Sequence, residues 1–148
     1  MIFLTVSVLA LSFPGCGKKE NTSDRTLRVG IVTYTQDDPF INTMTEQIRE
    51  DLKLKESKDM KILVSVKNGD NDQRDQDELV EEMIAAGCDV LCVNLVDRTA
   101  PSDIIKAARQ EKIPVIFFNR EPVKEDLMQW DQLQNSPARC REKLQQII

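Results

Sequence analysis

The sequence predicts an α/β protein built on an open parallel sheet with helices on both of its faces. Two observations predict this. Short apolar runs rich in β-branched residues alternate four times with polar or amphipathic segments, and the apolar runs lack the strict polar alternation of a half-exposed strand. The chain of 148 residues is long enough for one domain with a substantial core. Strands that alternate with helices favour parallel pairing through right-handed crossovers.

The first strand–helix unit is the most informative stretch of the chain. Its sequence, LRVGIVTYTQDDPF, begins with an apolar strand predicted at 27–34 and then becomes polar and acidic. Asp38 is predicted to cap a helix that has Pro39 in its first turn and spans 40–55. One face of this helix carries apolar residues three or four positions apart, at Ile41, Met44, Ile48 and Leu52.

The same alternation continues along the chain. The further predicted elements are a strand at 61–66, a helix at 73–86 that Gly87 ends, a strand at 89–94, a helix at 101–111 and a strand at 114–118. After Pro122 the pattern changes to a short helix at 123–133 and a weak helix from Ala138, with no fifth strand. The predicted strand order is 2-1-3-4.

Polar side chains follow three of the predicted strands where those strands end. With the order 2-1-3-4, the crossover direction changes between the first and third strands, and ligands bind outside the carboxyl ends of strands at such a point. The residues at this edge are Asp37, Asp38 and Phe40 after the first strand, Asn94 and Asp97 after the third, and Asn119 after the fourth.

These side chains suit a polyhydroxylated ligand. Carboxylates accept hydrogen bonds from hydroxyl groups, asparagine both donates and accepts, and an aromatic ring can cover the apolar face of a pyranose. The residues alone leave two alternatives open, because Asp38 could be only a helix cap and Phe40 only a core residue.

The N-terminal segment 1–16 is predicted to be a signal peptide. Its apolar stretch is too short for a bilayer about 30 Å thick, and its length is typical of a signal-peptide core. Gly15, Cys16 and the polar tether at 17–26 resemble a bacterial lipoprotein site, which predicts lipidation of Cys16 and a membrane contact through that anchor. No Lys or Arg precedes the apolar stretch, and Phe13 and Pro14 depart from the usual pattern, so a buried N-terminal strand or helix is the alternative.

Composition excludes several kinds of chemistry. The chain has no histidine, so a Ser-His or Cys-His pair and a histidine-bearing zinc site are excluded. A net charge of -5 without a basic stripe argues against nucleic acid. No glycine-rich phosphate loop is present, and NGDNDQ lacks the last ligand of a calcium loop, so no cofactor or metal is expected. Cys88 and Cys92 lie too far apart along a strand for a disulfide and are expected to be buried.

The stretch from 27 to 133 resembles the N-terminal lobe of the galactose/glucose-binding proteins, within the type I periplasmic binding protein family. The stretches that carry the resemblance are RVGIVTYTQDDPF, NGDNDQRDQ, AAGCDVLCVNLVD, KIPVIFFNREP and WDQL. The resemblance implies that Asp38 bonds sugar hydroxyls, that Phe40 stacks on the sugar ring and that Asn94 bonds the sugar from the next loop.

The resemblance also implies a role and a location. The protein is expected to be the periplasmic or cell-surface substrate-binding component of an ABC sugar transporter, with a monosaccharide ligand, a membrane permease partner and no enzymatic activity. The second lobe of the family has no counterpart here, and the tail at 134–148 departs from the pattern as a frameshifted or truncated gene would. Weak or lost sugar binding, an exposed sheet edge and self-association are therefore expected.

Two other classes share this arrangement of strands and helices. The sensor half of a LacI-type regulator needs a helix-turn-helix headpiece before its first strand, where this chain has an apolar segment and a cysteine. A small enzyme of flavodoxin or receiver type needs an aspartate after the third strand and a lysine further on. Asn94 and Asn119 stand at those strand ends instead.

Overall fold

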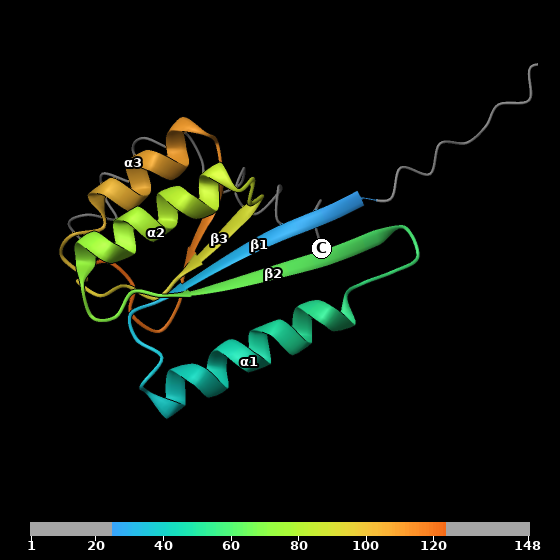
Figure 1. Ribbon diagram of the computed structural model, residues 1–148, viewed down its shortest axis with the longest axis horizontal. Helices are drawn as coiled ribbons and strands as arrows, with labels where there is room; N and C mark the ends of the chain where they lie inside the picture. The colour runs from blue at the N-terminus through green and yellow to red at the C-terminus, as the bar shows by residue number, and fades with distance from the viewer. Residues whose placement is uncertain (1–24, 124–148) are drawn as a thin grey trace, which may run out of the picture.

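The computed structural model describes residues 25–123, which fold around a four-stranded parallel sheet of order β2-β1-β3-β4 (Figure 1). The elements are β1 (Arg25–Thr33), α1 (Pro39–Leu54), β2 (Met60–Asn68), α2 (Gln73–Ala85), β3 (Val90–Val93), α3 (Ser102–Gln110) and β4 (Val115–Phe117). The predicted fold class, element order and strand order are confirmed.

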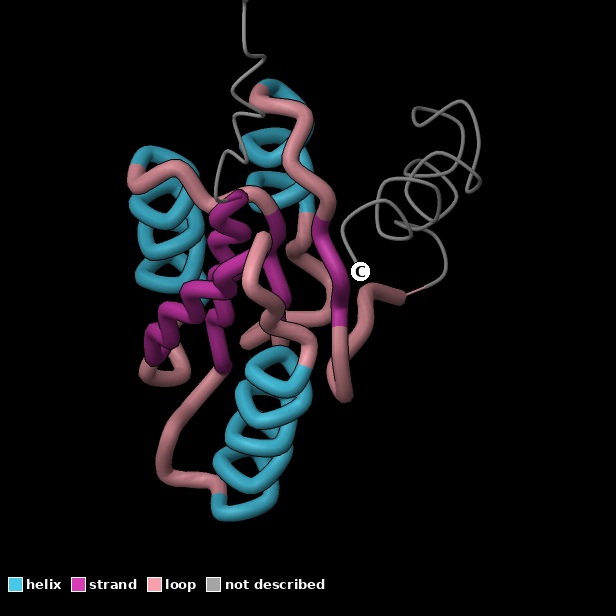
Figure 2. Tube along the Cα trace, turned by 90° about the vertical axis from the view of Figure 1, so that its right-hand side faces the viewer, coloured by secondary structure: helices cyan, strands magenta, loops and turns pink. Residues whose placement is uncertain are grey.

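The helices cover both faces of the sheet. Figure 2, seen from the end at which the strands begin, shows helices on either side of the strands. On one face, α1 packs Ile48 and Leu52 against a cluster formed by β1, β2 and β3. On the other face, Val80 of α2 and Ile104 of α3 belong to a second cluster that includes Leu91 of β3. The central strands β1 and β3 therefore have apolar side chains on both faces, which explains why their sequences lack polar alternation. The outer strand β2 differs, because buried or half-buried residues alternate with exposed ones along it.

The first two strands are longer than the sequence predicts. Strand β1 starts at Arg25, inside the predicted tether, and pairs along its whole length with β2, from Arg25 beside Met60 to Thr33 beside Asn68. Arg25 and Thr26 are exposed polar residues, so no apolar pattern marks this part of the strand. The strand persists there because β2 supplies hydrogen-bonding partners for its backbone.

The two described cysteines lie on opposite faces of the sheet. Cys88 belongs to the cluster beneath α2 and α3, whereas Cys92 belongs to the cluster beneath α1. Both are buried free thiols, as predicted. Burial raises the pKa of the Cys92 thiol to about 11, because a thiolate is poorly solvated there.

Local signals start and end α2 close to the predicted positions. Asp72 caps α2 by accepting hydrogen bonds from the backbone N–H groups of Arg74 and Asp75. The C-cap of α2 is Ala86, and Gly87 follows with a φ of 78°. Gly87 therefore supplies the left-handed residue just beyond the cap, where glycine is favoured.

Several predictions fall outside the described residues. These are the leader at 1–16 with Cys16, the tether up to residue 24, all but the first residue of the helix expected at 123–133, and the tail at 134–148. Within residues 25–123, no helix is long and apolar enough to cross a membrane. The outer strands of the described sheet carry partly exposed apolar residues, with Leu63 of β2 48% and Ile116 of β4 36% exposed. Self-association through such an edge stays a prediction.

Candidate ligand-binding site

The loops that follow β1, β3 and β4 lie at the same edge of the sheet, where the three parallel strands end (Figure 1). All six polar or aromatic residues predicted at this edge are on these loops or at the start of α1. Their side chains nevertheless differ in burial and in hydrogen bonding.

Asp38 uses both oxygens of its carboxylate within the protein. Its Oδ1 accepts a hydrogen bond from the backbone N–H of Phe40 at 2.8 Å, which makes Asp38 the N-cap of α1. Its Oδ2 accepts a hydrogen bond from the Tyr34 hydroxyl at 2.7 Å. The Tyr34 bond, followed by the backbone bond, lowers the pKa of the Asp38 carboxyl below its ordinary value, so the group is an anion at neutral pH. The predicted cap is confirmed, and its carboxylate faces Tyr34 as well.

Phe40 and Asp37 are both exposed beside this carboxylate. The Phe40 side chain is 59% exposed in the first turn of α1, so the alternative in which Phe40 is a core residue is wrong. The backbone N–H of Asp37 donates to the Thr35 hydroxyl at 3.1 Å, which shapes the loop just before the helix. An exposed aromatic ring next to an anionic carboxylate is thus available to a ligand.

Asn94 lies at the predicted edge but is fully buried. Its Nδ2 donates to the backbone carbonyl of Phe118 at 3.0 Å, and its Oδ1 accepts a longer hydrogen bond of 3.4 Å from the backbone N–H of Tyr34. The side chain therefore joins the ends of β1, β3 and β4. Direct contact between Asn94 and a ligand stays a prediction, and it requires the surrounding loops to move.

A sharp turn at Asn119 directs the loop that follows β4. Asn119 is exposed and has a φ of 57°, a left-handed conformation that asparagine tolerates better than most residues. The backbone N–H of Arg120 donates to the carbonyl of Phe118 at 2.6 Å across this turn. The turn sends Arg120 back over the sheet edge, where its guanidinium carbon lies 4.6 Å from the centre of the Tyr34 ring.

Two glutamines of α2 fix the loop that follows β3. The fully buried Gln76 donates through Nε2 to the carbonyl of Asn94 and accepts through Oε1 from the N–H of Val96, each at 2.9 Å. Gln73 accepts from the N–H of Asp97 at 2.7 Å. The Asp97 carboxylate accepts from the hydroxyl and the backbone N–H of Thr99, and these bonds lower its pKa. The Asp97 side chain therefore stabilises its own loop through its hydrogen bonds with Thr99.

Sequence patterns did not single out Tyr34, Gln76 or Arg120. Tyr34 continues an apolar strand and Gln76 interrupts no helical pattern, so neither carries a local signal. Arg120 follows an asparagine after a strand, which indicates a turn but gives no direction to the side chain. Their partners range from Asp38, 4 residues after Tyr34, to the pairing of Tyr34 with Arg120 across 86 residues, and the fold brings these groups together.

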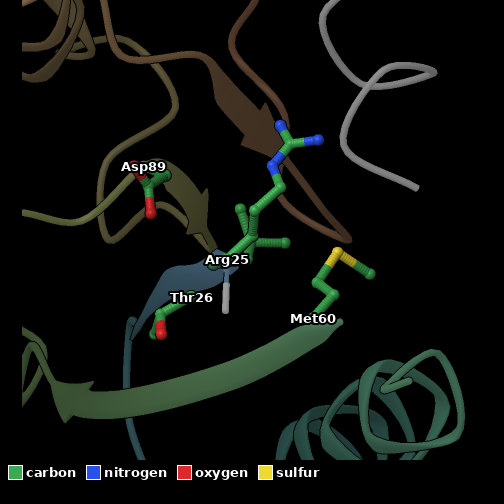
Figure 3. A pocket seen from close by; sticks show the side chains of 5 residues that line it. Arg25, Thr26, Met60 and Asp89 are labelled. Atoms are coloured by element: carbon green, nitrogen blue, oxygen red, sulfur yellow. The ribbon is translucent and has the colours of Figure 1, made fainter. Parts of the chain in front are cut away.

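Two cavities lie away from this edge. One, of about 290 Å³, is at the opposite end of the sheet and is lined by Arg25, Thr26, Leu27, Met60 and Asp89. Figure 3 shows the Arg25 guanidinium pointing away from Asp89, whose Oδ2 accepts instead from the backbone N–H of Arg28. The other, of about 370 Å³, lies between α1 and β2. Neither includes a predicted site residue, and residues 25–123 hold no group of three metal-ligating side chains.

Known proteins resemble this chain over the described domain. Over 95 residues, covering 64% of this chain and 28% of the relative, it is 34% identical to the D-galactose/methyl-galactoside binding periplasmic protein MglB of Haemophilus influenzae. It is 26% identical over 125 residues, 80% of this chain and 39% of the relative, to the ribose import binding protein RbsB of Bacillus subtilis. The chain thus spans between about a quarter and two fifths of the length of these relatives.

Solved structures agree with the fold. A carbohydrate transporter solute binding protein from Chloroflexus aurantiacus, in complex with D-glucose, matches with a TM-score of 0.55 and 29% identity over 66% of this chain and 27% of that chain. A solute binding protein from Actinobacillus succinogenes with bound D-allose matches with a TM-score of 0.56 and 22% identity over 67% of this chain and 34% of that chain, which supports the fold alone. The model of the periplasmic binding protein domain matches residues 29–135, most of the chain, so the protein belongs to the periplasmic binding protein family.

Proposed function

We propose that this protein binds a monosaccharide of the galactose or glucose type as the substrate-binding component of an ABC sugar transporter. The observation that carries the proposal is the pairing of the anionic Asp38 carboxylate with the exposed ring of Phe40 at the carboxyl edge of the sheet. The two proteins of highest identity described above are named for binding D-galactose or are in complex with D-glucose. Their names support the same class of ligand for this protein.

Asp38 and Phe40 would contribute different parts of the recognition. A carboxylate has about four acceptor positions, and hydrogen bonds within the protein use two of those of Asp38, which leaves the others for sugar hydroxyls. The Phe40 ring would cover the apolar face of the sugar. Asp37 and Asn119 are exposed nearby and would add polar contacts, and Asn94 would do so after a movement of its loop.

We expect the described residues to bind a sugar with low affinity. They approach a sugar from one side of the sheet edge, whereas strong binding of small ligands requires that most of the ligand surface be buried. We therefore expect dissociation constants in the millimolar range. The protein would bind and release its ligand unchanged, without catalysis, at a periplasmic or cell-surface location, with lipidation at Cys16 and a membrane permease as its partner.

The test is a titration of the full chain with D-galactose and D-glucose, followed by NMR. Shifts confined to Asp38, Phe40 and their neighbours are expected. Phe40→Ala should weaken binding about tenfold, or about 1.4 kcal/mol, by removing the stacking surface. Leu54→Ala is the matched control, because Leu54 is an 82% exposed apolar residue at the other end of the same helix. A folded protein that shows no shifts at tens of millimolar sugar, or equal binding by both variants, would contradict the proposal.

A further inference from the structure

Tyr34 lies between the Asp38 carboxylate and the Arg120 guanidinium, at the point where three loops meet. Its hydroxyl donates to Asp38 and its ring faces Arg120. We propose that Tyr34 and Arg120 form a positioning pair, which fixes the orientation of the Asp38 carboxylate and holds the three strand-end loops together. That this carboxylate is then presented to a sugar rests on the proposed function.

The Tyr34 hydroxyl removes a rotational freedom that the helix cap alone leaves. The terminal torsion of an aspartate is broad, so a carboxylate held through one oxygen can rotate. Here Oδ1 is held by the backbone N–H of Phe40 and Oδ2 by Tyr34, on opposite sides of the same group. The remaining acceptor positions therefore point in fixed directions, and a ligand that uses them loses less conformational entropy on binding.

Arg120 holds Tyr34 in place and joins the loops. Its Nη2 donates to the carbonyl of Val96 at 2.8 Å, which links the loop after β4 to the loop after β3. Its guanidinium also lies over the Tyr34 ring, which links both loops to the loop after β1. A planar guanidinium can stack on a ring while it donates in its own plane, and the compact ammonium group of lysine cannot do both in this way.

The charges around the carboxylate are consistent with this arrangement. The hydrogen bond to Asp38 raises the pKa of the Tyr34 phenol, and the nearby positive charge of Arg120 opposes this rise. From the other side, the Tyr34 bond is the largest cause that lowers the pKa of Asp38. The charged groups facing Tyr34 are thus Asp38 from its own loop and Arg120 from the loop after β4. Asp97, from the loop after β3, also has its pKa lowered by Arg120.

The test uses the full chain and four variants: Tyr34→Phe, Asp38→Asn, Arg120→Gln and the control Arg98→Gln. Tyr34 is the single tyrosine, so absorbance at alkaline pH follows its phenol directly. Arg98 is a suitable control because it lies in the same group of loops but donates to the carbonyl of Glu121. Far-UV circular dichroism confirms the folded state of each variant at each pH.

Four results are expected. The Tyr34 pKa falls towards about 10 in Asp38→Asn, rises further in Arg120→Gln and is unchanged in Arg98→Gln. The Asp38 carboxyl pKa, measured by carbon-13 NMR, rises in Tyr34→Phe. D-Galactose binding weakens about three- to tenfold in Tyr34→Phe and Arg120→Gln, as expected for the loss of one charge-assisted contact. Arg98→Gln binds as the unaltered protein does.

Two results would overturn the positioning pair. One is an Asp38 pKa that Tyr34→Phe leaves unchanged, and the other is a Tyr34 pKa that is the same in Asp38→Asn, in Arg120→Gln and in the unaltered protein. If the unaltered protein binds no sugar, the proposed function fails, while the two titrations still decide whether the pair exists. If Arg120→Gln does not fold, Tyr34→Phe and Asp38→Asn decide it, because the first keeps the ring and the second keeps the size of the side chain.

Discussion

Replacement of Gln76 by alanine should destabilise the protein more than any other change to a polar side chain of α2. The Gln76 side chain is fully buried between α2 and the loop after β3. It satisfies the carbonyl of Asn94 and the N–H of Val96. Alanine would leave both backbone groups without these partners, in a place where the fold admits little water.

The magnitude follows from these two bonds. Each buried polar group left unsatisfied costs about 1–3 kcal/mol, so the two together would lower the free energy of unfolding by about 2–6 kcal/mol. The lower end applies if water reaches Val96, which is only partly buried. Against a total stability of about 5–15 kcal/mol for a typical domain, this is a large loss.

The assay is urea unfolding of the full chain followed by far-UV circular dichroism, with amide exchange of Val96 as a local readout. Gln47→Ala is the matched control, because Gln47 lies on α1 and donates to Asp51 at the exposed surface. The control should change the free energy of unfolding by less than about 0.5 kcal/mol. The reasoning is refuted if Gln76→Ala is as stable as the control, or if exchange at Val96 is not faster.

Two further predictions concern close packing and burial. Gly69→Ala places a Cβ 2.8 Å from the backbone carbonyl oxygen of Thr33, which should lower the free energy of unfolding in urea by about 1–3 kcal/mol. Ser65→Ala, at an exposed position of β2, is the control. Equal losses of stability in the two variants would contradict the close packing at Gly69. The Cys92 pKa of about 11 lies above the ordinary value of about 8.5. The neutral thiol therefore stabilises the fold below the ordinary pKa, and this contribution is lost as the pH rises through about 11. Maleimide labelling mapped by mass spectrometry should be slow at Cys92 at pH 8 until urea unfolds the chain, and labelling at the same rate before and after unfolding would contradict the burial.

The candidate site shows which features a sequence pattern can predict and which depend on the fold. Asp38 was predictable as a cap because its signal, an acidic residue before proline at the start of an amphipathic helix, is local. Its second bond, to Tyr34, needed the loop geometry. Asn94 was correctly placed at the carboxyl edge, but the sequence does not show that its side chain is fully buried and donates to the carbonyl of Phe118, 24 residues later in the chain. Phe40 illustrates the converse, because its sequence context allowed either burial or exposure and the fold leaves it exposed.

The sequence by itself determined the fold class, the order of the elements and the edge of the sheet at which polar residues gather. These follow from hydrophobic periodicity and capping residues, which act between neighbours in the chain. Only the tertiary structure decided that β1 extends back to Arg25, that Gln76 holds the loop after β3, and that Arg120 lies over Tyr34. Each of these depends on partners contributed by another element, and packing sets the direction of a side chain in a loop. The physical chemistry of the site therefore comes from contacts between loops that lie far apart in the sequence.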